Sequence, residues 1–411
     1  SAVEPFIDNN STQNLLNAYV EFNPLPGLTL RITGGANVSN DNNRIYHNQK
    51  TFAGRQNTGL GLSTEMTNVR YQNSNILTFD KTINEHHFTI TAVAEQQFSK
   101  YNFSTVRASN FLVDQTGIFN LGGAGLVTAS SGAEKRVLNS YLGRVNYIFG
   151  GRYLLTASYR ADGSSVFGKN NKWGYFPSAS VAWRASEENF IRNLNVFSDL
   201  KFRVSWGITG SQAITPYQTL SQISSGGNYP YNGTDGTDLG FFIANAANPS
   251  LKWESTTQSN YGIDVGLFNG RLSITADYYF KTTKDLLMLR TLPAYTGFTS
   301  VIDNIGSIQN RGFELAISGD PFVGNFKWNT GFNISANRNK VLELGGVDRL
   351  GFRTTGGGYG VNTPFMYLVK GEPFGQIYGY GYEGTWGQGK ASEAAAFGQL
   401  PGDPHYTDKN K

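Results

Sequence analysis

The sequence predicts an all-β protein, and more specifically a transmembrane antiparallel β-barrel of which about twelve strands are present. Three observations support this fold class. Segments of about ten residues alternate apolar and polar side chains, as strands with one lipid face and one aqueous face do. Short and long connections alternate between these segments. The chain contains no apolar run of about 18 residues, the length that a transmembrane helix needs.

The clearest hairpin lies between Asn248 and Leu287. We expect a two-residue turn at Asn269-Gly270, because both residues tolerate the positive φ that such turns require. One face of the following strand is apolar and carries Leu272, Ile274, Ala276, Tyr278 and Phe280. The opposite face carries Arg271, Ser273, Thr275, Asp277, Tyr279 and Lys281. The chain offers little material for a second layer, so the apolar face is predicted to contact lipid.

The other predicted strands also pair as hairpins, up to Asn337. The turn between the first two contains Pro24 and Pro26, which cannot lie in a central ladder. In chain order these strands are Leu15–Phe22, Leu28–Ala36, Tyr71–Lys81, His86–Phe98, Asn139–Phe149, Arg152–Ala161, Ser178–Arg184, Leu200–Ile208, Gly312–Ser318 and Phe326–Asn337. With the two strands of the central hairpin, they make six hairpins.

Long polar connections separate the hairpins. We expect loops at Asn37–Glu65, Ser104–Glu134, Asp162–Lys172, Thr209–Pro249 and Leu287–Val301. One link, Ser186–Asp199, is predicted to contain a short helix that Ser186 caps, with Glu187 and Glu188 in its first turn. Short turns on one side and long loops on the other are typical of outer-membrane barrels, with the long loops extracellular.

The composition agrees with this fold and excludes several kinds of site. The 49 glycines and the aromatic share of 14% suit many β-turns and aromatic belts at membrane interfaces. A net charge of +4 gives no reason to expect a nucleic-acid partner. Without cysteine the chain has neither disulfides nor thiolate metal sites. After Val341 the sequence becomes rich in glycine, and no closing strand is expected there.

Several segments resemble the SusC/RagA family of TonB-dependent outer-membrane transporters. The matching segments keep the family's order and extend from Tyr159 nearly to the end of the chain. They are Tyr159–Gly168, Trp173–Arg184, Leu200–Gln212, Asn248–Glu254, Asn310–Leu315, Gly371–Gly375 and Pro401–Asp403. Several such segments in order make a specific match.

The resemblance implies a 22-stranded barrel, plugged by a separate N-terminal domain with a TonB box before it. It also implies a SusD-like surface lipoprotein as a lid, energy from TonB-ExbB-ExbD, and pairs of barrel-lid units in the outer membrane of a Bacteroides-type bacterium. Residues 1–411 are then expected to form a partial outer-membrane β-barrel domain with long extracellular loops. We expect no plug domain, TonB box or closing strands within these residues.

Two functions of different classes remain open. The first is active import of oligosaccharides or peptides with TonB energy. The second is a structural role, in which a SusC-like barrel serves as a scaffold in another outer-membrane complex. An enzyme is not expected, because the sequence contains neither an H-E-x-x-H nor a G-x-S-x-G motif. Gly379–Gly384 fits G-x-G-x-x-G, but it lacks the strand and helix that a dinucleotide site needs.

The candidate binding residues lie in loops. The loop Thr209–Pro249 combines aromatic platforms with carboxylates, which suits stacking on sugars or packing on peptides. Its candidate substrate contacts are Tyr217, Tyr229, Tyr231, Phe241, Phe242, Asp235 and Asp238. The alternative is that these side chains pack against neighbouring loops or against a capping lipoprotein. Asp408 and Asn410 begin like a calcium loop, so Ca²⁺ is a candidate ligand there and no other cofactor is expected.

Overall fold

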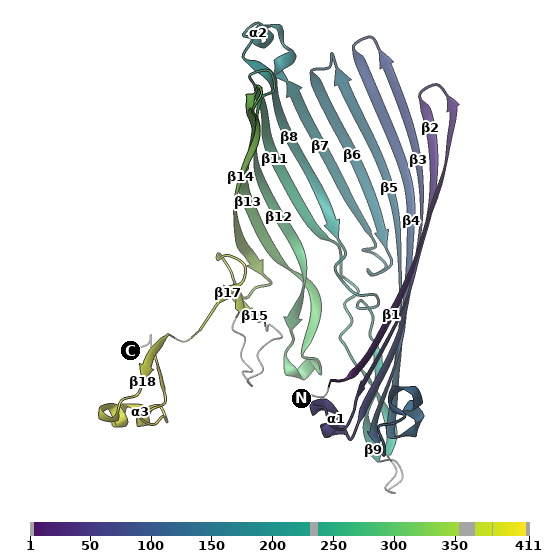
Figure 1. Cartoon of the computed structure of the whole chain (residues 1–411), viewed down its shortest axis with the longest axis vertical. Coiled ribbons are helices and arrows are strands. Elements are labelled where there is room, and N and C mark those ends of the chain that lie inside the picture. The colour runs from purple at the N-terminus through teal and green to yellow at the C-terminus, as the bar shows by residue number, and fades with distance from the viewer. Residues whose placement is uncertain (1–3, 231–236, 353–365, 380, 408–411) are drawn as a thin grey trace. The chain divides into compact units, whose positions relative to one another are not determined.

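Twelve strands form one antiparallel sheet in the computed structural model, which describes residues 4–230, 237–352, 366–379 and 381–407 (Figure 1). Each strand pairs with its neighbours in the sequence, except that β8 pairs with β11. The strands are β1 Phe6–Leu25, β2 Leu28–His47, β3 Leu60–Ile83, β4 His86–Phe111, β5 Ala124–Phe149, β6 Tyr153–Ser164, β7 Trp173–Arg184, β8 Phe197–Ser211, β11 Glu254–Leu267, β12 Leu272–Thr291, β13 Ser300–Val323 and β14 Lys327–Leu344. The predicted number and order of strands in this sheet are confirmed.

The strands extend well beyond their predicted ends. The expected loop Asn37–Glu65 is wrong over most of its length, because β2 continues to His47 and β3 begins at Leu60. The expected loop Ser104–Glu134 is wrong in the same way, because β4 and β5 pair along most of it. These extensions mix polar and apolar side chains on both faces, so they show no period-two contrast. Backbone hydrogen bonds to neighbouring strands hold them in place, and hydropathy does not report those bonds.

The remaining expected loops are also shorter than predicted or contain structure. β6 continues to Ser164 and β7 begins at Trp173, so the loop between them is shorter than Asp162–Lys172. β12 likewise continues to Thr291, and β13 begins at Ser300. The segment Thr209–Pro249 contains a separate hairpin of β9 Ile223–Pro230 and β10 Thr237–Ile243. The connections described here also hold α1 Phe52–Asn57, η1 Gly117–Gly123, η3 Ala294–Thr296 and the pair described next.

The link from β7 to β8 contains a helix, but its predicted cap is wrong. A 3₁₀ turn, η2, covers Ala185–Glu187, and a single α-helical turn, α2, covers Asn189–Arg192. Glu188 occupies the N-cap position of α2 and makes no capping hydrogen bond. Its carboxylate instead accepts bonds from Arg152 at 2.8 Å and Tyr153 at 2.6 Å. The hydrogen bond from Tyr153, together with the charge of Arg152, lowers the pKa of Glu188 below its ordinary value.

The turn of the central hairpin is longer than predicted. β11 ends at Leu267, which pairs with Leu272 at the start of β12, so four residues connect the strands. Three residues of this turn have a positive φ: Phe268 at 54°, Asn269 at 57° and Gly270 at 83°. The Asn-Gly signal therefore located the turn, but it missed Phe268, a bulky residue in a conformation that such residues rarely adopt.

Short turns and long connections lie at opposite ends of the sheet. Figure 1 shows α2 at the end where the hairpin turns lie, whereas α1 and β9 lie at the other end. The predicted alternation of short and long connections is therefore present. We call the end with α1 and β9 the loop end.

The two faces of the sheet differ in chemistry. One row of register partners runs across seven neighbouring strands and is almost entirely apolar: Phe88, Tyr147, Leu155, Val181, Val204, Tyr261 and Tyr278. We call this face the outer face. The residues just before Val204 and Tyr278 in the sequence, Arg203 and Asp277, project from the opposite face and are joined by an ion pair of 3.2 Å. We call that face the inner face.

The apolar part of the outer face has the height of a membrane. On β4 it extends from Phe88 to Phe98, 11 residues whose outer positions are apolar except for Gln96, which bonds Asn139 on β5, and the next outer position is Lys100. A tilted transmembrane strand needs roughly 9–11 residues. Aromatic pairs lie at both limits: Phe88 and Tyr147 have ring centroids 4.8 Å apart, and Tyr71 and Phe98 have centroids 6.2 Å apart. Such aromatic girdles mark the two interfaces of membrane barrels.

Buried apolar side chains gather near the loop end. One cluster contains Val166, Phe167, Phe176, Ile214, Leu251 and Trp253. The indole N–H of Trp253 donates to the carbonyl of Lys172 at 2.9 Å, which satisfies its polar atom. A second cluster contains Tyr46, Ala108, Phe111 and Ile118. These clusters fix the connections onto the strands that they join.

A second compact unit consists of Gly306–Asn310 and Arg338–Lys411, whereas Ser1–Ile305 and Arg311–Asn337 form the first. Within the second unit, the amide of Val341 donates to Glu372 at 2.9 Å, and the ring of Trp386 lies 3.8 Å from that of His405. Its further elements are β15 Arg349–Phe352, β16 Met366–Val369, β17 Gln376–Ile377, β18 Tyr382–Thr385, η4 Gln388–Lys390, α3 Ala391–Ala396 and β19 Pro404–Tyr406.

Within the described residues, no helix has both the length and the apolar character needed to cross a membrane.

Candidate functional site: an arginine and amide pocket on the inner face

Two arginines face the same way from strands that are two places apart in the sheet. Arg70 on β3 pairs with Ser99 on β4, and Ser99 pairs with Arg136 on β5. Register partners project from the same face, so both arginines belong to the inner face. Adjacent strands lie about 4.8 Å apart, which separates the two Cα atoms by about 10 Å. Asn37 on β2 continues this row.

The next inner row toward the short-turn end supplies amide side chains. Asn17, Gly35, Gln72 and Gln97 follow one another as register partners from β1 to β4. Gly35 keeps this row open, because a Cβ there would lie 2.8 Å from the side-chain oxygen of Asn17. Together the two rows line a pocket of about 340 Å³, and Gln212 completes its wall.

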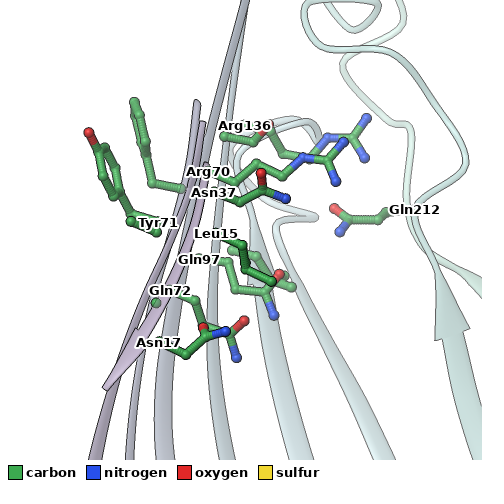
Figure 2. Close-up of a pocket in the computed structure, with 14 residues that line it drawn as sticks. Leu15, Asn17, Asn37, Arg70, Tyr71, Gln72, Gln97, Arg136 and Gln212 are labelled. Carbon is green, nitrogen blue, oxygen red and sulfur yellow. The ribbon is translucent and has the colours of Figure 1, made fainter. Parts of the chain in front are cut away.

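The chain that follows β8 lies against this part of β5 and β6. Arg136 donates from Nη2 to the carbonyl of Ile214 at 2.7 Å. Ser164, at the end of β6, donates to the side-chain oxygen of Gln212. Figure 2 shows Arg70 and Arg136 extending toward the same side, with Gln212 facing them. Two segments far apart in the sequence are thereby held across one pocket.

Positive charge in this pocket is not balanced by a partner in the described part of the chain. Neither Arg70 nor Arg136 forms an ion pair with a carboxylate there. Glu134 lies two residues from Arg136 on β5, yet no ion pair joins them. Glu95 accepts a hydrogen bond of 2.6 Å from Gln97 instead. The pocket therefore offers guanidinium and amide donors to an anionic or strongly polar ligand.

Aromatic rings near the pocket project from the opposite face. Tyr71 points away from the arginines in Figure 2, and Tyr71 and Phe98 lie next to each other on the outer face. They belong to the girdle described above. The inner wall of the pocket is consequently made of amides, arginines, Ser99, Leu15 and Leu138.

A second charged cluster lies on the inner face nearer the short-turn end. Arg203 on β8 donates to Asp264 on β11 at 2.8 and 3.0 Å and to Asp277 on β12 at 3.2 Å. Thr275 adds a bond of 3.2 Å to Asp264. The three charges are joined across three adjacent strands, so this cluster fixes the wall more than it offers donors to a ligand.

A third polar group lies at the loop end, within the cluster around Tyr46. The phenol of Tyr46 donates to Asp114 at 2.8 Å, and Asp114 also accepts from the backbone of Gln49. Burial, followed by the bond to Asp114, raises the pKa of Tyr46 well above its ordinary value. The bond ties the segment before η1 to the end of β2.

None of the predicted loop candidates that the structure describes is among the residues that line this pocket. Tyr217 adopts a positive φ of 70°, and its carbonyl accepts from Leu220. Phe241 and Phe242 on β10 are exposed by 75% and 53%, and as neighbours on a strand they point to opposite faces. Their backbones pair with Ser225 and Ser224, so the hairpin presents one ring on each side.

The other predicted residues are only partly described. Tyr229 and Asp238 are backbone register partners in the β9–β10 hairpin. Tyr231, Asp235, Asp408 and Asn410 lie outside the described residues. In the part of the chain that the structure describes, no group of three or more histidine, cysteine or acidic side chains is arranged to hold a metal ion.

The pocket arginines were missed because they fall just outside the predicted strands. Arg70 precedes Tyr71, where we placed a strand start, and Arg136 precedes Asn139, another expected start. The period-two alternation continues through Val69, Arg70, Tyr71 and Gln72, so it could have extended β3. On β5 it is interrupted at Leu138 and Asn139, so it gave no such signal for Arg136.

The chain is similar in sequence to TonB-dependent receptors. The family model described as "TonB dependent receptor-like, beta-barrel" matches residues 3–408. The TonB-dependent receptor P39 of Formosa agariphila is 37% identical over 377 residues, which cover 91% of this chain and 35% of that protein. The TonB-dependent receptor SusC of Bacteroides thetaiotaomicron is 34% identical over 80% of this chain and 32% of its own length. The chain thus spans about a third of the length of these relatives.

Solved structures agree with the sequence relatives. The structure of the RagAB peptide transporter matches 92% of this chain and 41% of its own chain, with a TM-score of 0.78 and 26% identity. The RagAB peptide importer in the "open-open" state matches with the same TM-score and identity. The resemblance to SusC and RagA that the sequence motifs indicated is confirmed, as is the barrel fold class.

Proposed function

Because the chain belongs to the TonB-dependent receptor β-barrel family, we propose that the protein containing it imports oligosaccharides or peptides across the outer membrane of a Bacteroides-type bacterium. The chain supplies part of the barrel wall in this proposal. Transport is powered by TonB-ExbB-ExbD, which acts through a region outside these residues. The barrel performs no chemistry on its cargo.

The contrast between the two faces of the sheet carries this proposal. The outer face is apolar over the height of a membrane and bordered by aromatic pairs such as Tyr71 and Phe98. The inner face carries arginines, amides and hydroxyls, and it is hollowed at the pocket beside Arg70 and Arg136. A wall of this kind separates lipid from an aqueous path that polar solutes can follow.

A SusD-like surface lipoprotein is the proposed partner at the loop end. The solved neighbours are complexes named RagAB, and one relative is named SusC. The exposed rings of Phe241 and Phe242, one on each face of the β9–β10 hairpin, offer apolar contacts that a partner can cover. Pairs of barrel-lid units are part of the same proposal, as is contact with outer-membrane lipid.

The loop residues singled out in the sequence keep a proposed role. Tyr217, Tyr229, Tyr231, Phe241, Phe242, Asp235 and Asp238 would meet cargo or the lid before the cargo reaches the pocket. Aromatic and carboxylate side chains on loops suit such first contacts. Asp408 and Asn410 would begin a Ca²⁺ loop that orders the chain around them.

Deleting the gene and following uptake tests the proposal directly. A strain without the protein should lose uptake of one class of labelled oligosaccharide or peptide, and a plasmid copy should restore it. Affinity purification from outer membranes in mild detergent should recover a lipoprotein with the barrel. If the deletion strain takes up every glycan and peptide tried at the normal rate, and no lipoprotein is recovered, the import proposal fails.

A further inference from the structure

We propose that Arg70 and Arg136 form a carboxylate-binding site on the transport path, and that the cargo is an acidic peptide. The inference rests on the proposed import function and narrows its substrate class. Three observations carry it: two arginines on one face of the sheet, the lack of an acidic partner for them among the described residues, and the amide lining around them.

The backbone register places both arginine side chains on the same face of the sheet. Both arginines project from the inner face on either side of Ser99, a small side chain that leaves the space between them open. In Figure 2 they reach toward Gln212 from the same wall. Arg136 is held in this direction by its bond to the carbonyl of Ile214, which uses one of its nitrogens. The other donors of the guanidinium remain for a ligand.

Two like charges on one face that lack a partner favour an anion between them. Arginine stays protonated at any physiological pH, so neither charge can be removed by losing a proton. The facing groups are Glu134 on β5 and Glu95 on β4, and neither forms an ion pair with an arginine. Arg160 on β6 is already paired with Asp162 at 2.8 Å. A carboxylate is the ligand that matches the planar fork of a guanidinium with two parallel hydrogen bonds.

The rest of the lining favours a peptide as the bearer of that carboxylate. Asn17, Asn37, Gln72, Gln97 and Gln212 present both donors and acceptors, as the N–H and C=O groups of a peptide backbone require. The aromatic residues that border the pocket, Tyr71 and Phe98, project from the outer face, so they offer no platform for a sugar ring inside it. Leu15 and Leu138 add apolar surface for a side chain next to the carboxylate.

Binding of matched peptides to the full-length barrel protein, purified from outer membranes in detergent, tests this inference. The probes are a fluorescent glutamate-rich peptide and its glutamine counterpart, both amidated at the C-terminus. Arg70→Gln should weaken binding of the glutamate peptide about tenfold, because it removes a charge-assisted hydrogen bond. The glutamine peptide should bind more weakly to the native protein and should not respond to the substitution. Added salt should weaken only the glutamate peptide.

Arg70 is the better position for the test, because it has no described partner in the protein and Arg70→Gln should leave the structure intact. Arg136→Gln would also remove the bond to Ile214. Two further variants, Arg70→Lys and Arg144→Gln, separate binding from folding. Arg70→Lys keeps the charge but loses the fork, and it should recover only part of the affinity. Arg144→Gln changes an arginine on the inner face of β5, eight residues from Arg136, and should bind both peptides as the native protein does.

The outcomes distinguish this inference from the proposed function. Equal affinity for the two peptides, or an equal loss of both on Arg70→Gln, overturns the carboxylate site while uptake of peptides in cells still supports import. Binding of an oligogalacturonate but of neither peptide overturns the acidic peptide as cargo. A strain whose uptake of every solute survives deletion of the gene contradicts import itself.

Discussion

The hydroxyl of Ser164, at the end of β6, donates a hydrogen bond to the side-chain oxygen of Gln212, directly after β8. Ser164 is almost completely buried, with 1% of its surface exposed. The bond fastens the start of the long β8–β11 connection to the inner wall. It also places the Gln212 amide opposite the two pocket arginines.

Removing this hydroxyl should loosen the pocket. Ser164→Ala leaves the Gln212 oxygen without its donor, and we expect a loss of about 1–3 kcal/mol in the free energy of unfolding. Urea unfolding in lipid vesicles would measure it. Ser158→Ala is the control, because Ser158 bonds Ser178 on the same face but does not touch Gln212. If both variants unfold at the same urea concentration as the native protein, the bond does not fasten the connection.

The outer face should reject charge. Val204 lies in the apolar row of β8 with 49% of its surface exposed, and lipid would cover that surface. Val204→Arg should therefore cost up to about 2–4 kcal/mol, the upper range for an arginine on the lipid face of a barrel. Reversible unfolding into urea from thin bilayers would report it, with Val204→Leu as an apolar control. A charged variant as stable as the control would place this face in water.

The inner charge cluster should depend on its arginine more than on either acid. Arg203→Ala leaves the carboxylates of Asp264 and Asp277 close together without a cation, and we expect a loss of about 1–3 kcal/mol because these groups are partly solvated. Asp277→Asn keeps the Arg203–Asp264 pair and should cost less than about 1 kcal/mol. Unfolding of the two variants under one condition would compare them. A larger loss for Asp277→Asn than for Arg203→Ala would contradict the view that the arginine holds this cluster together.

Tyr46 should stay protonated when other tyrosines ionise. Burial and Asp114 raise its pKa in the folded protein above the value of about 10 that tyrosine has when unfolded. The stability that it contributes is therefore complete below pH about 10 and is lost as the pH rises beyond that. Ultraviolet titration of the native protein and Tyr46→Phe should show one fewer late-ionising phenol in the variant. Identical titration curves at high pH would contradict this.

The membrane-facing half of the fold was readable from the sequence. Residues Leu272 to Phe280 alternate because one face of β12 meets lipid and the other meets water, and this contrast is what hydropathy reports. The twelve strands of the sheet were found in this way. Beyond Phe98 on β4 the contrast disappears although the strand continues to Phe111, because Lys100 lies on the outer face and Tyr101 and Phe103 lie on the inner face.

The pocket could not be read in the same way. The turn at Asn84-Glu85 fixes which residue of β4 lies opposite Arg70, so that half of the site follows from a short-range signal. The partner of Ser99 on β5 depends on the connection from Phe111 to Ala124, which includes η1. The number of residues that this connection leaves unpaired sets the register of β5 against β4, and the residue types do not reveal that number. Gln212 reaches the pocket through contacts with Ser164, which are tertiary.

Cysteine labelling at two adjacent residues tests most directly whether this chain is a wall between lipid and an aqueous path. The chain has no cysteine, so Arg144→Cys on the inner face and Val145→Cys on the outer face each introduce a single thiol into it. In intact outer membranes, a water-soluble maleimide should label the Arg144→Cys thiol, whereas a lipid-soluble maleimide should label the Val145→Cys thiol. Equal labelling of both thiols by the water-soluble reagent would contradict the account, because both faces would then lie in water.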